Sequence, residues 1–414
     1  MTTSGRFLFA TWEGGGTAPP ELAVAARLRA RGHTVEVLAD PSIERDARAA
    51  GAEFTPWRAA PHRATRTPES EIIGDWKART PLGAFARARD RHAFRPAALF
   101  AREVRARFAE KRADVVVADA LLFGAMVGAE ATGARTAALL PMTSFLPAPG
   151  RPPAGLGLRP ARGPAGRARD RVLYAAGDAL LWRSCLGYLN HARREVGLAP
   201  VAHPLDQHAR LDRVLVQTSA WFDWDAPRAR GNVRYVGPEL GDPAWAAGLD
   251  DADVLVAFST TFMGQTAILQ RIVDALAPLP VRAIVTTGPS LEPSALRAAP
   301  NVTVRASASH AAILARASLV VTHGGHGTVI RALASGVPVL CMPMGRDQGD
   351  NAARAEAIGA GATLPAHAST RRIRRAIARA LGSAALKDGA RRAKERIAAE
   401  RTGDAAVEEL EGLL

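Results

Sequence analysis

The chain has 414 residues, a mass of 43.6 kDa, 48% hydrophobic residues and a formal net charge of +14. This length suits two domains of about 200 residues each, and the apolar fraction excludes a disordered chain. The basic residues are scattered along the chain and only 5% of residues are aromatic, which argues against nucleic acid as a partner.

Neither a membrane span nor a signal peptide is expected. No apolar run reaches the roughly 18 to 20 residues that a membrane helix needs, and the opening sequence is one Arg followed by a strand-like run. The two cysteines, Cys185 and Cys341, cannot form a disulfide framework, so a reduced, cytoplasmic setting is expected.

The first half opens with the pattern of a βαβ unit. A glycine-rich turn at 13–17 follows an apolar strand, Pro19 and Pro20 suit the first turn of a helix, and Gly32 suits its end. Such a crossover implies a parallel sheet covered on both faces. The strands expected in this half are 7–10, 33–39, 115–118 and, as the last, 214–218.

Residues 145–170 are dense in proline and glycine, so no regular element is expected there. The segment is either a loop over a binding cleft or a linker, and a cleft loop is favoured because helical patterns flank it.

The second half repeats the alternation of strands and helices, which predicts an α/β fold of two Rossmann-like domains. A hinge is expected at 234–238, and a cleft at the carboxyl ends of the two sheets. A basic helix is expected at 371–401. The other strands expected here are 254–258, 283–286, 302–304, 319–322 and 337–341, and the helices are 265–276, 311–317, 328–334, 347–358 and one from 370 onward.

The strongest motif is 321–328, where a strand end, a glycine-rich turn and a helix start follow one another. Glycines let backbone N–H groups approach an anion, and a helix N-terminus adds free donors and a partial positive charge. The motif therefore predicts a phosphate or diphosphate cradle around His323 and Thr328; a tight turn with a core histidine is the alternative. Downstream, Asp347 and Gln348 start a helix and could accept and donate hydrogen bonds to the hydroxyls of a polyol. The alternative is that they only cap the N-terminus of that helix.

Residues 320–361 resemble the donor-binding motif of the family 1 glycosyltransferases, most closely the bacterial branch that decorates macrolides, polyketides and other natural products, antibiotics among them. The resemblance extends over nearly the whole chain. It implies a GT-B fold, with an acceptor-binding domain at 1–236, a nucleotide-sugar domain at 237–395 and a helix at 396–414 that packs back on the first domain. It also implies inverting, metal-independent transfer of a hexose from a UDP- or dTDP-sugar to a hydroxyl of an apolar natural product, with no cofactor besides that donor.

The resemblance assigns donor contacts residue by residue. The diphosphate is expected to meet His323, with the backbone of Gly324, Gly325, Gly327 and Thr328, and the hydroxyl of Thr260. Asp347 and Gln348 match the pair that holds the sugar hydroxyls. Asp119 matches the aspartate that orients a catalytic histidine.

The sequence departs from the family at the place of that histidine, which is Thr17 here. A threonine hydroxyl near its ordinary pKa is a poor base. Asp119 or Glu13 is the alternative base, suited to a phenol, another acidic hydroxyl or a nitrogen acceptor. An ordinary solvated or capping carboxylate is the competing interpretation of each.

Two further departures concern the nucleoside. Arg331 stands where the family often has a glutamate that reaches the ribose, and we expect its guanidinium to reach a phosphate. Near Ser307 many relatives place an aromatic residue that stacks on the base; the run 305–310 has none, and His310 is expected to take part of that role.

Other functions are less well supported. The run 251–253 matches the Asp-x-Asp of metal-dependent transferases, but it directly precedes a strand and lacks further spaced ligands. The glycines at 14–16 leave a dinucleotide-dependent oxidoreductase open, without the G-x-G-x-x-G spacing. The missing histidine leaves open a non-catalytic sugar-nucleotide-binding relative. The acceptor's identity, the choice of UDP or dTDP and the oligomeric state stay open.

Overall fold

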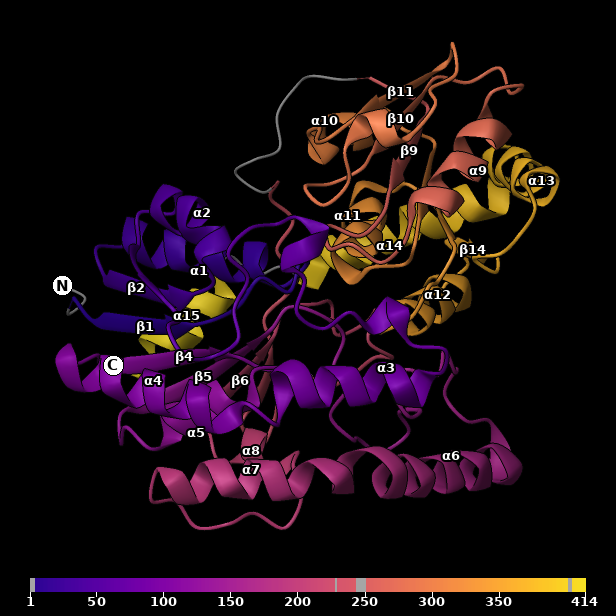
Figure 1. Ribbon diagram of the computed structural model, residues 1–414. Coiled ribbons are helices and arrows are strands. Elements are labelled where there is room, and N and C mark those ends of the chain that lie inside the picture. The colour runs from indigo at the N-terminus through magenta and orange to yellow at the C-terminus, as the bar shows by residue number, and fades with distance from the viewer. Residues whose placement is uncertain (1–3, 228, 243–250, 401–403) are drawn as a thin grey trace.

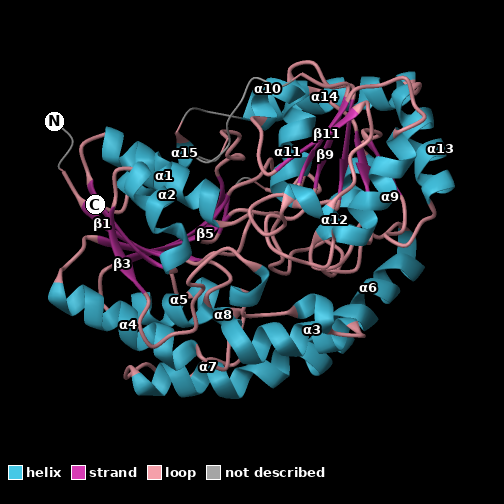
Figure 2. Ribbon diagram, turned by 45° about the horizontal axis from the view of Figure 1, so that its top comes forward, coloured by secondary structure: helices cyan, strands magenta, loops and turns pink. Residues whose placement is uncertain are grey.

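The computed structural model describes residues 4–227, 229–242, 251–400 and 404–414. The strands in these residues form two sheets, one in each half of the chain, and helices cover both faces of each (Figures 1 and 2). This confirms the expected fold class of two parallel α/β sheets.

The first sheet contains eight strands within the described residues: β1 (Arg6–Ala10), β2 (Thr34–Ala39), β3 (Glu53–Pro56), β4 (Val115–Asp119), β5 (Arg135–Leu140), β6 (Arg213–Val216), β7 (Ala229–Arg230) and β8 (Val233–Tyr235). Their order is β3-β2-β1-β4-β5-β6-β8-β7, and only β7 runs antiparallel to its neighbour. The central strands are apolar on both sides because helices cover both faces; every residue of β4 is buried.

The second sheet is wholly parallel, in the order β11-β10-β9-β12-β13-β14. Its strands are β9 (Val254–Ala257), β10 (Ala283–Thr286), β11 (Val302–Arg305), β12 (Leu319–Thr322), β13 (Val339–Cys341) and β14 (Gly361–Thr363).

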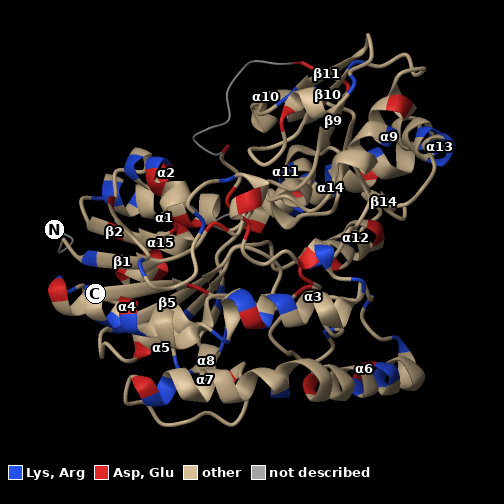
Figure 3. Cartoon of the chain, viewed as in Figure 1, with Lys and Arg blue, Asp and Glu red and all other residues tan. Residues whose placement is uncertain are grey.

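The α-helices lie between the strands along the chain, as the crossovers of a parallel sheet require. In the first half they are α1 (Ala18–Ala30), α2 (Glu44–Ala49), α3 (Pro81–Ala88), α4 (Ala97–Glu110), α5 (Phe123–Glu130), α6 (Gly163–Gly177), α7 (Arg183–Glu195) and α8 (Asp206–Ala209). In the second half they are α9 (Thr266–Leu276), α10 (His310–Leu314), α11 (His326–Ser335), α12 (Gln348–Ala357), α13 (Thr370–Leu381), α14 (Ala384–Glu400) and α15 (Ala405–Glu411). Lys and Arg lie on helices of both halves, interspersed with Asp and Glu (Figure 3).

Several expectations about the elements are wrong. The proline-rich segment 145–170 contains the first turns of α6, which starts at Gly163 with a proline in its first turn. The strand β6 is not the last of its sheet, because β8 pairs with it. The basic helix expected at 371–401 is two helices separated at Gly382, and residue 401 lies outside the described residues. The strands β3, β5, β8 and β14 were not expected, because they are short or lack alternation.

The end of the chain crosses from the second sheet back to the first. Helix α14 packs on α11, whereas Ala406, Val407 and Leu410 of α15 belong to the core under α1. Figure 1 shows α15, in yellow, among the indigo and purple elements of the first half. Arg31 and His33 hold it there through Glu411, at 2.7 and 3.0 Å.

No described helix combines the length and the apolar character that a membrane crossing requires.

The contact between α4 and α5 depends on a glycine. A Cβ at Gly124 would lie 2.3 Å from the carbonyl oxygen and 2.7 Å from the Cα of Ala97, both of which are backbone atoms that cannot rotate away. We therefore expect Gly124→Ala to cost about 1–3 kcal/mol of unfolding free energy, measured by urea denaturation. Gly187→Ala on α7 is the control, since nothing lies within 4 Å of its added Cβ; helix propensity should raise stability there by up to about 1 kcal/mol. Equal effects of the two substitutions would contradict this account.

Candidate active site

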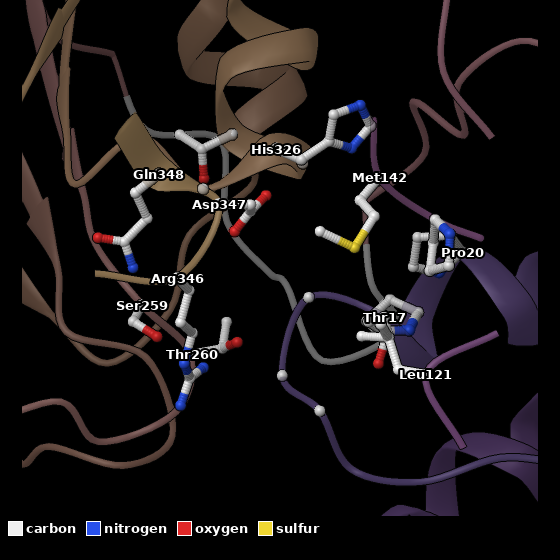
Figure 4. Close-up of a pocket in the computed structure, with 18 of the residues that line it drawn as sticks. Thr17, Pro20, Leu121, Met142, Ser259, Thr260, His326, Arg346, Asp347 and Gln348 are labelled. Atoms are coloured by element: carbon white, nitrogen blue, oxygen red, sulfur yellow. The ribbon is translucent and has the colours of Figure 1, made fainter. Parts of the chain in front are cut away.

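A cavity of about 400 Å³ lies between the carboxyl ends of the two sheets. Figure 4 shows its two sides: Thr17, Pro20, Leu121 and Met142 come from the first half, and Ser259, Thr260, Arg346, Asp347 and Gln348 face them from the second. The two sides approach closely. The added Cβ of Gly15, whose φ is +79°, would lie 2.6 Å from the Thr260 hydroxyl.

The glycine-rich motif of the second half forms one wall of the cavity. Strand β12 ends at Thr322, Gly324 turns with a φ of 94°, and α11 begins at His326. A Cβ at Gly324 would lie 2.8 Å from the backbone oxygen of Gln348, so the turn needs a residue without one. His323, Gly325, Gly327 and Thr328 line the cavity, and Gly324 shapes the turn without lining it.

His323 is neutral at physiological pH. Its side chain is 7% exposed, and burial lowers its pKa to about 3. A neutral imidazole still offers one N–H donor, so the wall combines a side-chain donor with the free N–H groups of a ten-residue helix.

Asp347 and Gln348 both line the cavity at the start of α12. The Asp347 side chain makes no capping hydrogen bond, which removes the N-capping alternative; its Oδ2 accepts from Asn351 at 2.8 Å, and burial raises its pKa. The Gln348 Oε1 accepts from the backbone of Met344 at 2.7 Å.

The residues expected near the nucleoside also line the cavity, namely Thr260, Ser307, His310 and Arg331. His310 Nε2 lies 3.3 Å from the Thr286 hydroxyl, and burial lowers the His310 pKa to about 4. Burial also lowers the pKa of Arg331, whose Nε has no hydrogen-bond partner among the described residues.

The first half contributes an aromatic chamber, which we define as Trp12, Phe85, His92, Phe94, Phe123 and Trp182. The rings contact one another: His92 lies 4.0 Å from Trp12 and Phe94 lies 4.2 Å from Phe123, centroid to centroid. This chamber suits a large, flat, apolar molecule.

The proline-rich segment does not cover this cavity, contrary to expectation. None of the described lining residues comes from 145–170. The backbone N–H groups of Gly155 and Gly157 instead donate to Asp350 of α12, each at 2.6 Å, so the segment bridges the two halves.

The three candidate catalytic residues occupy different places. Thr17 lines the cavity, and Asp119 lies behind it, 1% exposed, at the end of β4. Burial raises the Asp119 pKa to about 6. Glu13 does not line the cavity in the described structure: its carboxylate accepts from Gly15 N at 2.9 Å and pairs with Arg66 at 2.7 Å. These contacts hold the glycine-rich turn in place.

His92 and Arg346 line the cavity but were not singled out from the sequence. His92 lies on a π-helical turn, Arg89–Ala93, a local distortion frequent at functional sites. It is 2% exposed, neither ring nitrogen has a partner in the described part of the chain, and burial lowers its pKa to about 3. Arg346, with a φ of 55°, pairs with Asp75 of the first half at 2.7 Å. His92 reaches the site through a contact with Trp12, which is distant in sequence, whereas Arg346 directly precedes Asp347 and could have been found from that adjacency.

Within the described residues, no three His, Cys, Asp or Glu side chains converge in a way that would hold a metal ion. Asp251 pairs with Arg282 at 3.2 Å, and Asp253 accepts from the backbone of Arg282 at 2.8 Å. The Asp-x-Asp run therefore anchors a strand start.

Comparison with known proteins identifies the family. Residues 270–413 match the family model for the C-terminal domain of erythromycin biosynthesis protein CIII-like proteins. Over 99% of both chains, the sequence is 30% identical to 4'-demethylrebeccamycin synthase of Lentzea aerocolonigenes. The chain belongs to the family 1 glycosyltransferases of bacterial natural-product biosynthesis. NDP-glycosyltransferase YjiC of Bacillus subtilis is similar over a shorter stretch, 28% identical across 32% of this chain and 35% of that protein.

Solved structures share the GT-B fold of this glycosyltransferase. The glycotransferase of kitacinnamycin has a TM-score of 0.74 and 22% identity, covering 100% of both chains. The calicheamicin glycosyltransferase CalG4 has a TM-score of 0.68 and 21% identity over 99% of this chain and 98% of that one. Glycosyltransferase VinC, solved in complex with dTDP, has a TM-score of 0.63 and 17% identity over 99% and 98%.

Family membership fixes the general activity. This glycosyltransferase transfers a sugar from a nucleotide donor to a natural-product aglycone. This activity replaces the alternative of a dinucleotide-dependent oxidoreductase, which rested on the glycines at 14–16. In the structure, the turn at Gly15 faces Thr260 of the second half.

The buried histidines make stability depend on pH. The folded-state pKa of His92, about 3, lies below the unfolded value of about 6.5. The unfolded chain therefore takes up a proton that the folded chain refuses, and stability falls as the pH drops from about 6.5 towards 3. From pH 7 to pH 5, the wild type should lose about 2 kcal/mol more unfolding free energy than His92→Phe.

Urea denaturation at the two pH values measures this difference. His191→Phe is the matched control, because that histidine is exposed on α7, and it should behave as the wild type does. If His92→Phe loses as much stability as the wild type on acidification, His92 is not held neutral by the fold.

Proposed function

We propose that this chain is an inverting, metal-independent transferase that moves a hexose from a UDP- or dTDP-sugar to a hydroxyl of an apolar aromatic molecule. The observation that carries this proposal is one continuous cavity, lined by the glycine-rich motif of the second half and the aromatic chamber of the first. Residues 1–236 would bind the acceptor and 237–395 the donor, with 396–414 tying the end of the chain to the first half.

The second half would bind the donor through its diphosphate. His323 and Thr328 supply side-chain donors, and the backbone of Gly325 and Gly327 lies at the positively polarised start of α11. Thr260 reaches the same region from the end of β9, and Asp347 and Gln348 would hold the sugar hydroxyls. The dTDP in the VinC structure supports a thymidine diphosphate donor.

Transfer would invert the anomeric carbon. The acceptor oxygen attacks from the side of the first half as the bond to the diphosphate breaks towards the second half. The developing charge on the diphosphate would be stabilised by His323 and the α11 dipole, fixed donors in a dry site. Asp119 and Thr17 would remove the acceptor's proton; they are favoured over Glu13 because Glu13 pairs with Arg66 and does not line the cavity in the described structure.

The aromatic chamber would hold the acceptor. Its rings offer flat apolar surfaces, and the unpartnered His92 nitrogens would meet a polar group on the acceptor. The similarity to 4'-demethylrebeccamycin synthase supports a natural product of this kind.

Donor binding tests the cradle. We expect UDP or dTDP, but not NAD, to raise the melting temperature. His323→Ala should weaken this binding by about 10- to 100-fold, because it removes a donor to a charged group. His367→Ala, an exposed histidine on a loop, is the control. A nucleotide that binds His323→Ala as tightly as the wild type would refute the cradle.

The same binding assay tests Arg331. If its guanidinium reaches a phosphate, Arg331→Glu should weaken nucleotide binding by at least 10-fold through loss and reversal of charge. Unchanged donor affinity would remove Arg331 from the phosphate site.

Chelation tests metal independence. Because donors and a helix dipole would carry the diphosphate charge, treatment with EDTA followed by dialysis should leave the transfer rate within about twofold. The measurement is glycoside formation by mass spectrometry. A loss of activity that Mg²⁺ or Mn²⁺ restores would overturn this part of the proposal.

A further inference from the structure

Four polar side chains meet behind the Gly14–Gly16 turn, and each has a buried atom without a hydrogen-bond partner in the structure as described. The atoms are Trp12 Nε1, Thr17 Oγ1, Glu21 Oε1 and Asp119 Oδ2. Trp12, Thr17 and Glu21 are the side chains that approach the Asp119 carboxyl. Buried polar atoms are almost always paired, so such a cluster beside a cavity calls for an explanation.

Glu21 and Asp119 are two carboxyl groups buried against each other. Glu21 lies in the first turn of α1, Asp119 ends β4, and each is 1% exposed. Their remaining oxygens are already engaged: Thr11 donates its hydroxyl to Glu21 Oε2, and the Leu121 N–H donates to Asp119 Oδ1 at 2.6 Å. Two ionised carboxylates would place two acceptors face to face, whereas one proton between them satisfies both.

Burial raises the pKa values of both Glu21 and Asp119, and each carboxyl also affects the pKa of the other. Burial, with the nearby Asp119 charge, raises the pKa of Glu21 well above its ordinary value. Burial raises the pKa of Asp119 to about 6, against the hydrogen bond from the Leu121 N–H and the nearby polar groups of Glu21, Trp12 and Thr17, which lower it. Both pKa values are thus displaced towards the protonated form, as expected of two buried carboxyl groups that share one proton.

The surroundings add no cation to the pair. From α8, the buried His208 binds the backbone oxygen of Ala120 at 2.9 Å, and burial lowers its pKa to about 4. From the π-helical turn, the neutral His92 packs on Trp12. Of the largest contributions to the Asp119 pKa within the described residues, Glu21 is the one that comes from an ionisable side chain.

We propose that Glu21 and Asp119 form a single carboxyl pair that holds one proton and receives the acceptor's proton through the Thr17 hydroxyl. This inference rests on the proposed function. Thr17 lines the cavity, whereas neither carboxyl does in the described structure, so the hydroxyl is the only member of the three that an acceptor can touch.

The proton balance closes within the pair. As the acceptor oxygen forms its bond to the anomeric carbon, its proton passes to Thr17 Oγ1, and the hydroxyl proton of Thr17 passes to Asp119 Oδ2. The electron pair of the broken glycosyl bond leaves with the diphosphate. The pair begins with one proton and ends with two, and solvent removes the extra proton after product release. Glu21 is a positioning residue here: it acts on the substrate only through Asp119.

The pH profile of kcat/KM tests the role of Glu21. Asp119 must be ionised to accept a proton, so the wild-type rate should fall as the pH drops through about 6. Glu21→Leu removes a hydrogen bond that lowers the Asp119 pKa, so the acidic limb should move up by about one pH unit. Glu21→Gln keeps an N–H donor, and its limb should stay near that of the wild type.

Glu44→Leu, an exposed acidic residue in the first turn of α2, is the control and should not move the limb. Infrared spectra of the resting enzyme at pH 7 give a second measurement: the wild type should show the C=O band of a buried protonated carboxyl, and Glu21→Gln should lack it. Two results would refute the proposed carboxyl pair. One is a Glu21→Leu variant whose kcat/KM changes by the same factor at every pH, so that the acidic limb stays in place. The other is a protonated-carboxyl band that persists in Glu21→Gln.

Failure of the proposed function has a different signature. In that case the wild type would form no glycoside at any pH, although nucleotide binding and the infrared band are unaffected. Retention of nucleotide binding by both Glu21 variants also separates a change in proton transfer from misfolding.

Discussion

Asp223 holds the two halves of the molecule together. It is fully buried, and its carboxylate accepts from Arg354 of α12 at 2.8 Å, from Arg151 of the proline-rich segment at 3.1 Å and from the Tyr235 hydroxyl at 2.6 Å. A buried charge is tolerated only when such partners surround it. Its neighbour Phe222 lies in the core of the second sheet, so the segment that carries Asp223 belongs to both halves. Together with the Arg346–Asp75 pair and the bonds from Gly155 and Gly157 to Asp350, this contact holds the carboxyl ends of the two sheets opposite each other across the cavity.

Several ionisable side chains that line the cavity or lie behind it are buried, and their pKa values are displaced accordingly. Burial holds His92, His323 and His326 neutral, with pKa values of about 3, 3 and 4, and it raises the pKa of Asp119 to about 6. In such surroundings fixed dipoles act more strongly than they do in water. In the proposed function, the start of α11 and the neutral imidazole of His323 would stabilise the charge of the diphosphate.

The sequence predicted the parts of this structure that are encoded locally. The turn after β12, the start of α12 and the first βαβ unit follow from glycine, proline and apolar periodicity within a few residues, and the structure has them near the expected positions. Strands such as β3 and β14 were missed because edge strands of three or four residues carry little periodicity. The expectation that 145–170 covers the cavity was wrong. Proline and glycine content predicts an irregular segment, but it does not reveal which residue, here Asp350, holds that segment in place. His92 and Glu21 were missed because their neighbours in the site, Trp12 and Asp119, are distant in sequence. Arg346 was missed although it directly precedes Asp347.

Two features of the first half favour the same kind of acceptor: the threonine at position 17, where the family usually has a histidine, and the aromatic chamber. A histidine at that place would bring a strong base to the acceptor, whereas a hydroxyl backed by an ionised carboxyl near pKa 6 is a weaker one. A weaker base suffices when the acceptor gives up its proton readily, as a phenol or an acidic ring nitrogen does. Such groups belong to flat aromatic molecules, which are also what Trp12, Phe94 and Phe123 would bind by stacking. If the proposed roles hold, the aromatic chamber and the proton transfer through Thr17 would favour the same class of acceptor.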